Sequence, residues 1–276
     1  MRTLIFRIPE PGWLISMIAM PNETATLTLI GGPTLLIEYA GLRILTDPAF
    51  DQPQSYPAGG ITLTKKTGPS LSVDQILPID IVLISHEQHL DNLDHAGRAM
   101  LPQAQRVFTT PAGAPKLGAN AAGIATWAST TVPLSDGRAL TITSTPARHG
   151  PHGFEPISGD VTGFVLQADG SPAIYVSGDT VWYSGLAEIP QRFPVGLAVL
   201  FTGAAQPRGP FDVTMNTNDA VEAAAYFKDA AIVAIHNEGW EHFTQTQQDV
   251  ATAFKVVGID SRLRLLEPGK PTTLTL

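Results

Sequence analysis

The segment IVLISHEQHLDNLDHAG carries the side chains of this protein that are best suited to chemistry. Its histidines and aspartates are His86, His89, Asp91, Asp94 and His95. The chain has 7 histidines in 276 residues, so three of them fall within one short stretch. Imidazole and carboxylate groups are ligands that zinc, manganese and iron accept. Because the chain has no cysteine, a transition-metal site has to be built from such residues.

Three further segments carry a histidine or an aspartate directly behind an apolar run. They are His149 after residues 140–145, Asp179 after 173–177 and His236 after 231–235. Taken singly, each has an ordinary explanation, such as a hydrogen-bonded loop histidine or an aspartate that caps a turn or helix. The recurrence at four expected strand ends favours one shared metal site, because strand ends are rigid enough to hold ligands in place. We expect His95 and His152 to lie at the surface instead.

The apolar patterns around these segments predict many strands with a few helices between them. Strands are predicted at residues 24–30, 34–39, 42–47, 79–85, 105–110, 124–127, 131–134, 140–145, 162–167, 173–177, 196–202 and 231–235. Helices are predicted at residues 91–101, with Asp91 or Asn92 as the N-cap, and at 217–228 and 244–258. The stretch 51–70, rich in Pro, Gly, Ser and Thr, is predicted to be a long surface loop.

This order of elements favours one domain made of two packed sheets with outer helices. We assign residues 21–276 to that domain and residues 1–20 to an N-terminal extension. An open Rossmann sheet is disfavoured, because the dinucleotide glycine fingerprint and a regular alternation of strand and helix are both missing.

Composition narrows the classes of partner. The formal net charge is -8 and no long basic run is present, which argues against a nucleic-acid interface. No run reaches the roughly 18 apolar residues of a membrane span. Pro9, Glu10 and Pro11 interrupt the apolar N-terminus, so a secretory leader is disfavoured. We expect a cytoplasmic protein that acts on a small molecule, and the oligomeric state stays open.

Five motifs, LTDP, LISH..H.DNLD, TPARHG, YVSGDT and AIH.EGW.HF, occur in an order that resembles the metallo-β-lactamase superfamily. The resemblance extends from about Thr24 to the end of the chain. Within the superfamily it looks closest to the L-ascorbate-6-phosphate lactonase-like and N-acyl-phosphatidylethanolamine phospholipase D-like hydrolases. It implies an α+β fold, a four-layer αββα sandwich, with the metal site at the edge where the two sheets meet.

The resemblance also implies a role for each strand-end residue. The implied ligands are His86, His89 and His149 for a first ion, Asp91 and His236 for a second, and Asp179 as the bridge. Where only one ion binds, Asp91 would orient the attacking water instead. Asp47, in LTDP, would support the ligand loop from behind, since a carboxylate there fixes ligand orientation.

The ligand loop departs from the family pattern H-x-H-x-D-H. Here it reads HEQHLDN, and we interpret this as a one-residue insertion that keeps both His86 and His89 as ligands. The alternatives place Gln88 or Glu87 at a histidine position. Asn92 stands where the final histidine belongs, so the second ion would be weakly held, hydrated or completed by Asp94. Zinc is the expected metal, as one ion or two, and manganese or iron also suits these ligands.

The implied activity is hydrolysis of a small ester, lactone or phosphoester. A metal ion lowers the pKa of a bound water to about 7 and so supplies hydroxide near neutral pH. We expect Trp240 to border the substrate pocket and His242 to donate a hydrogen bond or proton, although Trp240 and Phe243 could instead pack under the final helix. Arg148 is the expected anion contact, or else a surface residue. The alternatives are an iron-dependent oxidoreductase and a metal-poor binding or sensing protein.

Overall fold

A computed structural model describes residues 23–276, so the predicted extension at residues 1–20 lies outside the described part of the chain. Two seven-stranded mixed sheets make up most of it. The spatial order of the first sheet is β16 (Thr272–Thr275), β1 (Thr24–Gly31), β2 (Thr34–Tyr39), β3 (Leu42–Thr46), β6 (Ile79–Leu83), β7 (Ala104–Thr109) and β8 (Ala121–Gly123). The antiparallel meander β1–β2–β3 was predicted from sequence, and β3, β6, β7 and β8 then run parallel.

The second sheet is built from the middle and the end of the chain. Its spatial order is β15 (Leu263–Arg264), β14 (Ala231–Ile235), β13 (Val195–Phe201), β12 (Ala173–Val176), β11 (Gly163–Ala168), β10 (Ala139–Thr145) and β9 (Ser129–Pro133). The strands β9 to β12 are antiparallel, whereas β12 to β15 are parallel. Parallel strands need crossover connections, and helices supply several of them.

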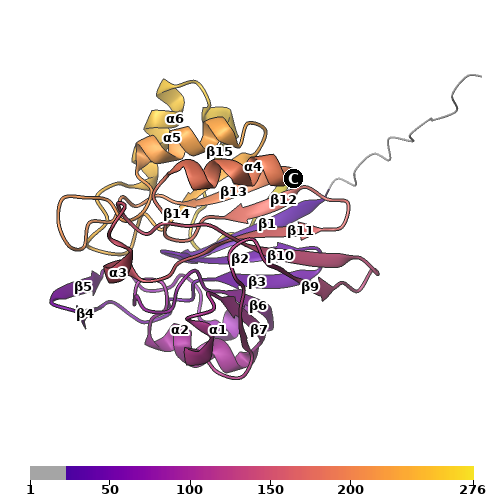
Figure 1. Cartoon of the computed structure of the whole chain (residues 1–276), viewed down its shortest axis with the longest axis horizontal. Coiled ribbons are helices and arrows are strands. Elements are labelled where there is room, and N and C mark those ends of the chain that lie inside the picture. The colour runs from indigo at the N-terminus through magenta and orange to yellow at the C-terminus, as the bar shows by residue number, and fades with distance from the viewer. Residues whose placement is uncertain (1–22) are drawn as a thin grey trace, which may run out of the picture.

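Helices cover the outer faces of both sheets (Figure 1). The α-helices are α1 (Val73–Ile76), α2 (His95–Met100), α3 (Glu155–Ser158), α4 (Ile189–Arg192), α5 (Thr217–Tyr226) and α6 (Gln247–Val256). Short 3₁₀ turns occur at η1 (Leu101–Gln103), η2 (Ala114–Lys116), η3 (Ser184–Glu188) and η4 (Asp260–Arg262). With α1 and α2 below the first sheet and α4 to α6 above the second, the fold is the expected four-layer αββα sandwich.

Alternation of side chains along the strands explains these four layers. In β13, Leu197 and Val199 enter the core between the two sheets, whereas Ala198 and Leu200 pack under α5 and α6. All four side chains are fully buried. A strand that is covered on both faces has a continuous run of apolar residues in its sequence. The segment GLAVLFT, residues 196–202, shows this pattern.

The region predicted as a surface loop at residues 51–70 contains a β-hairpin instead. Its strands, β4 (Gln54–Ala58) and β5 (Ile61–Lys65), pair with each other in a separate small sheet. Tyr56 and Leu63 bury one face of the hairpin against Trp240. The prediction was wrong because Pro, Gly, Ser and Thr indicate a loop locally, whereas this hairpin depends on packing against a distant segment.

Two smaller expectations also change. The helix predicted at residues 91–101 begins only at His95, and its N-cap is Asp94, whose side chain accepts a hydrogen bond from the Gly97 amide. The strand predicted at residues 124–127 is replaced by the short β8, which ends at Gly123. The helices α5 and α6 lie within their predicted ranges, and Asn216 and Thr246 cap them.

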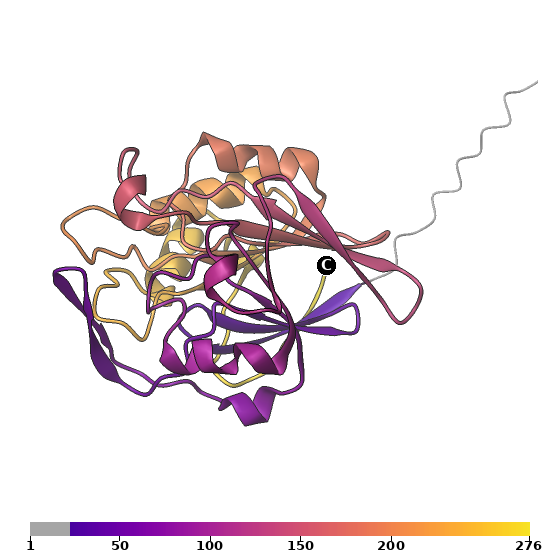
Figure 2. The same ribbon diagram turned by 60° about the horizontal axis from the view of Figure 1, so that its bottom comes forward.

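One end of the molecule gathers the segments that surround the ligands. Figure 2 shows the β4–β5 hairpin, α3 and the loop that follows β13 together at this end, although they are far apart in sequence. Within residues 23–276, no helix has both the length and the apolar character needed to cross a membrane.

Candidate metal centre

Strand ends place six predicted ligands at one edge of the sandwich. His86, His89 and Asp91 follow β6, His149 follows β10, Asp179 follows β12, and His236 follows β14. Their ligand atoms fall into two groups, and within each group they lie within 4.8 Å of one another. The first group is His86, His89 and His149, and the second is Asp91, Asp179 and His236. The convergence that the sequence predicted is therefore present in the fold.

The first group consists of three imidazoles whose nitrogens face a common point. His86 Nε2 lies 2.9 Å from His89 Nδ1, and His89 Nδ1 lies 3.1 Å from His149 Nε2. His86 and His149 are buried, and His89 is partly so. Three ring nitrogens this close together either share protons or hold a cation.

Hydrogen bonds on the far side of the His149 and His86 rings indicate which ring nitrogens carry a proton. His149 Nδ1 lies 2.7 Å from the Val213 carbonyl, which can only accept, so this nitrogen carries the proton. Ser85 Oγ donates to Asp47 at 2.8 Å and therefore accepts from His86 Nδ1 at 2.9 Å. The inner Nε2 atoms of both rings then present lone pairs. This is the arrangement in which histidines bind metals, with the other ring nitrogen held by a carbonyl or a carboxylate.

The second group is held around Asp179. Asp179 Oδ1 lies 3.3 Å from His236 Nε2, and Oδ2 lies 3.7 Å from His149 Nε2 and 3.9 Å from His86 Nε2. This carboxylate therefore lies between the two groups, the position expected of a bridge. Both ring nitrogens of His236 are buried and lack a hydrogen-bond partner among the described residues. Buried polar atoms without a hydrogen-bond partner are rare in folded proteins. A bound cation would give one of the two His236 nitrogens a partner.

The pKa values agree with ionised Asp91 and Asp179 and with neutral His86 and His89. Burial alone raises the pKa of Asp91 and of Asp179, but the neighbouring histidines outweigh it, so both carboxyls have pKa values below their usual range. Burial and the nearby His149 lower the pKa of His89 to about 4. Burial and His89 lower the pKa of His86 as well. Neutral imidazole and ionised carboxylate are the forms that bind metal.

Asp47 lies behind the ligand loop, where its motif suggested. It accepts hydrogen bonds from both the amide and the hydroxyl of Ser85, each at 2.8 Å. Burial raises the pKa of Asp47 to about 8, and the two hydrogen bonds from Ser85 only partly oppose the rise. A positive charge nearby would favour its ionised form.

Asn92 and Asp94 lie in different places. The Asn92 amide donates to Asp179 Oδ1 at 3.3 Å, and its own Oδ1 is buried without a partner among the described residues. Asp94, by contrast, accepts from the amides of Phe50, Asp51 and Gly97 and from Lys65 Nζ. Its oxygens are occupied in this structural role, so Asp94 does not complete the second group.

His242 reaches the centre from the segment after β14. Its Nε2 lies 3.0 Å from Asp91 Oδ2, and its Nδ1 is buried without a partner in the described chain. His242 thus holds Asp91 from the side, although it belongs to neither ligand group. The sequence suggested a place near the chemistry for this residue but not its contact with Asp91.

Trp240 and Arg148 lie outside the wall of the pocket next to the ligands. Trp240 is 4% exposed and packs against Tyr56 of the β4–β5 hairpin, with ring centroids 5.7 Å apart, and not under the final helix. The guanidinium of Arg148 stacks on Tyr183 at 4.6 Å from the ring centre. Arg148 lines a separate groove on the other side of His149. His95 and His152 are exposed at the surface, as expected.

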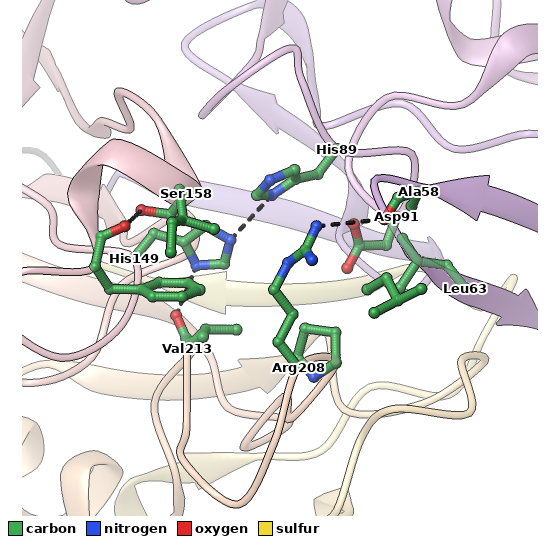
Figure 3. A pocket seen from close by; sticks show the side chains of 12 residues that line it. Ala58, Leu63, His89, Asp91, His149, Ser158, Arg208 and Val213 are labelled. Carbon is green, nitrogen blue, oxygen red and sulfur yellow. Dashed lines mark hydrogen bonds between the residues drawn. The ribbon is translucent and has the colours of Figure 1, made fainter.

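A narrow pocket opens on the ligands His89, Asp91 and His149 (Figure 3). Its free volume is about 50 Å³, which is room for a small chemical group. The rest of the wall is largely apolar and includes Leu63, Phe154, Ile157, Pro207 and Val213. Arg208 also lines the pocket. Sequence reasoning missed these wall residues, because no motif marks them and loops far apart in the chain bring them together.

Comparison with known proteins agrees with this fold. A family model described as a beta-lactamase superfamily domain matches residues 42–237, which is more than half of the chain. The protein therefore belongs to the beta-lactamase superfamily, as the motif order suggested. The finer resemblance to the lactonase-like and phospholipase D-like branch stays a prediction.

Three relatives illustrate the similarity. The UPF0173 protein YddR of Bacillus subtilis (strain 168) is 26% identical over 258 residues, which is 90% of this chain and 99% of YddR. A UPF0173 metal-dependent hydrolase of Anaeromyxobacter sp. (strain K) is 27% identical over 223 residues, 76% of each chain. The crystal structure of isothiocyanate hydrolase from Delia radicum gut bacteria superposes with a TM-score of 0.78 at 25% identity, covering 91% of this chain and 100% of that one.

Proposed function

We propose that this protein is a metal-dependent hydrolase that cleaves a small ester, lactone or phosphoester with water. The observation that carries this proposal is the convergence of three imidazoles and a second Asp–Asp–His group at one pocket. The name of the Anaeromyxobacter relative, a metal-dependent hydrolase, supports the same activity. We expect zinc as the metal and a cytoplasmic location.

The two ligand groups would each hold one metal ion. His86, His89 and His149 would hold the first ion, and Asp91, Asp179 and His236 a second. When bound, a metal at these ligands supplies Lewis acidity and a water of lowered pKa. Hydrolysis of an ester adds the water oxygen to the acyl carbon and releases an alcohol that needs one proton.

Asp91 and His242 are the groups placed to move that proton. Where only one ion binds, Asp91, which lines the pocket and is held by His242 at 3.0 Å, can orient the attacking water, and His242 can serve as hydrogen-bond donor or proton source. The paired imidazole keeps Asp91 ionised and in place. We therefore expect His242→Ala to lower kcat about 10- to 100-fold with the metal content unchanged. Full activity in this variant would remove His242 from the mechanism.

The central test combines metal analysis with a substrate panel. The purified protein should contain one or two transition-metal ions and should hydrolyse at least one member of a panel of lactones, carboxyl esters and phosphodiesters. His149→Ala should lose the first ion and the activity together. His152→Ala is the matched control, because this histidine lies three residues away with its side chain 91% exposed. A folded wild-type protein that binds no metal, or that consumes oxygen with bound iron, would overturn the proposal.

Isothiocyanates are a second candidate class of substrate. The structural relative of that name covers 91% of this chain, and the apolar wall of the pocket suits a hydrocarbon tail. Addition of one water to the central carbon of R–N=C=S and loss of carbonyl sulfide leaves the amine R–NH2. Including allyl and benzyl isothiocyanate in the panel, with the amine product measured, decides between this class and the esters.

A further inference from the structure

Arg208 is the cationic side chain of the pocket wall that belongs to neither ligand group. It extends from the loop after β13 into the pocket that His89 and Asp91 also line (Figure 3). Apart from the ligands, Ser158 and Arg208, the wall is apolar. The Arg208 side chain is exposed to solvent, so an incoming molecule can reach its charge.

The guanidinium is held in place without being neutralised. Nη1 donates to the Gly59 carbonyl at 3.0 Å, and Nη2 donates to the Ala58 carbonyl at 3.3 Å. Within residues 23–276 it forms no ion pair with a carboxylate, and Asp91 is instead paired with His242. Arg208 has five N–H donors, so most of its hydrogen-bonding capacity and its full charge remain available.

The tip of the β4–β5 hairpin is shaped to receive this side chain. Gly59 has a left-handed backbone, with φ of +55°, which turns the chain between β4 and β5. A Cβ at this position would lie 3.1 Å from Arg208 Nη2, tighter than ordinary packing allows. The hairpin tip thus depends on a glycine both for its own turn and for the close approach of Arg208.

We propose that Arg208 binds an acidic or oxyanionic group of the substrate beside the bond that is cleaved. The apolar wall would hold the rest of the molecule, so the preferred substrate is a small amphipathic anion. Guanidinium binds carboxylate and phosphate groups through two parallel hydrogen bonds, which fixes orientation as well as charge. This inference rests on the proposed hydrolase activity and adds the charge of its substrate.

Kinetics on two matched substrates test the proposal. Bis(4-nitrophenyl) phosphate carries one negative charge, whereas 4-nitrophenyl acetate is neutral, and both release 4-nitrophenol. R208Q should lower kcat/KM for the anion at least about tenfold, mainly through KM, and change the neutral ester less than about twofold. R208K should retain part of the preference. R106Q removes the same charge from an exposed part of β7 and should change neither rate.

A binding measurement separates this inference from the hydrolase proposal. Calorimetry should show that phenylphosphonate binds the zinc-loaded wild type about tenfold or more tightly than R208Q at equal metal content. G59A should weaken binding by an intermediate factor. Weaker binding to R208Q without turnover of any substrate would overturn the hydrolase proposal alone. Equal affinity of wild type and R208Q would overturn the role of Arg208, whatever the activity.

Discussion

The two ligand groups of the centre differ in how completely the protein prepares them. In the first group, Ser85 and the Val213 carbonyl hold the outer nitrogens of His86 and His149, so their inner lone pairs are fixed. In the second group, both ring nitrogens of His236 are buried without partners among the described residues, and so is Oδ1 of the neighbouring Asn92. The first group is therefore preorganised, whereas the second depends on what binds there.

This contrast suggests two ions of unequal affinity. Preorganised ligands lose little conformational entropy on binding, which favours tight association. An amide oxygen in place of an imidazole weakens a transition-metal site, because these ions prefer nitrogen ligands. We therefore expect a tight first site and a weaker second one.

Removal of the metal should have the largest effect on activity and stability, because it acts on both ligand groups at once. Chelation with an excess of a strong chelator should abolish hydrolysis. It should also lower the free energy of unfolding by about 4 kcal/mol relative to protein in zinc at 1,000 times the dissociation constant. For a domain of this size that corresponds to a fall in Tm of about 10 °C. Scanning calorimetry measures the fall, and zinc, but not magnesium, should reverse it.

Asp94 offers a test of whether stability and metal binding are separate in this loop. Asp94→Asn leaves the Lys65 ammonium buried without its carboxylate, since the two side chains are 0% and 5% exposed. Breaking a buried pair on one side costs about 3 kcal/mol. We expect a lower denaturant midpoint with an unchanged number of bound ions. Loss of the second ion in this variant would show that Asp94 serves the centre after all.

The sequence predicted which histidines and aspartates converge, because each stands in a local motif behind an apolar strand. It predicted the place of Asp94 less well, because a helix cap and a metal ligand draw on the same residue types. The β4–β5 hairpin was missed because its pairing is stabilised by Trp240, about 180 residues further along the chain. Arg208 was only one of several scattered cations in sequence, and it gains its position from that same hairpin.

Ser85 tests the preorganisation of the first group. Ser85→Ala removes the hydroxyl that links His86 Nδ1 to Asp47, so the ring is free to rotate or to change tautomer. Loss of such an outer contact typically costs 10- to 100-fold in metal affinity. We expect the zinc affinity of the first site to fall by about this factor, as measured by competition with a chromogenic chelator. An unchanged affinity would mean that packing alone orients His86.

Asn92 tests the weaker half of the centre, and its expected effect is the smallest. Asn92→His restores an imidazole at the position where the family pattern has one, beside Asp179 and the unpartnered His236. The affinity of the second ion should rise about tenfold, which equals about 1.4 kcal/mol. Because Asn92 is fully buried, the larger ring should cost about 1–3 kcal/mol of apo-protein stability through overpacking.

Titration of the apo-protein with cobalt separates the two sites, since the absorption band of the first site should saturate at the same concentration in the wild type and in Asn92→His. Asn92→Ala is the matched control that removes the amide without adding a ligand, and it should not strengthen the second site. A second ion bound no more tightly by Asn92→His than by the wild type would mean that the residue at position 92 does not limit the affinity of the second site.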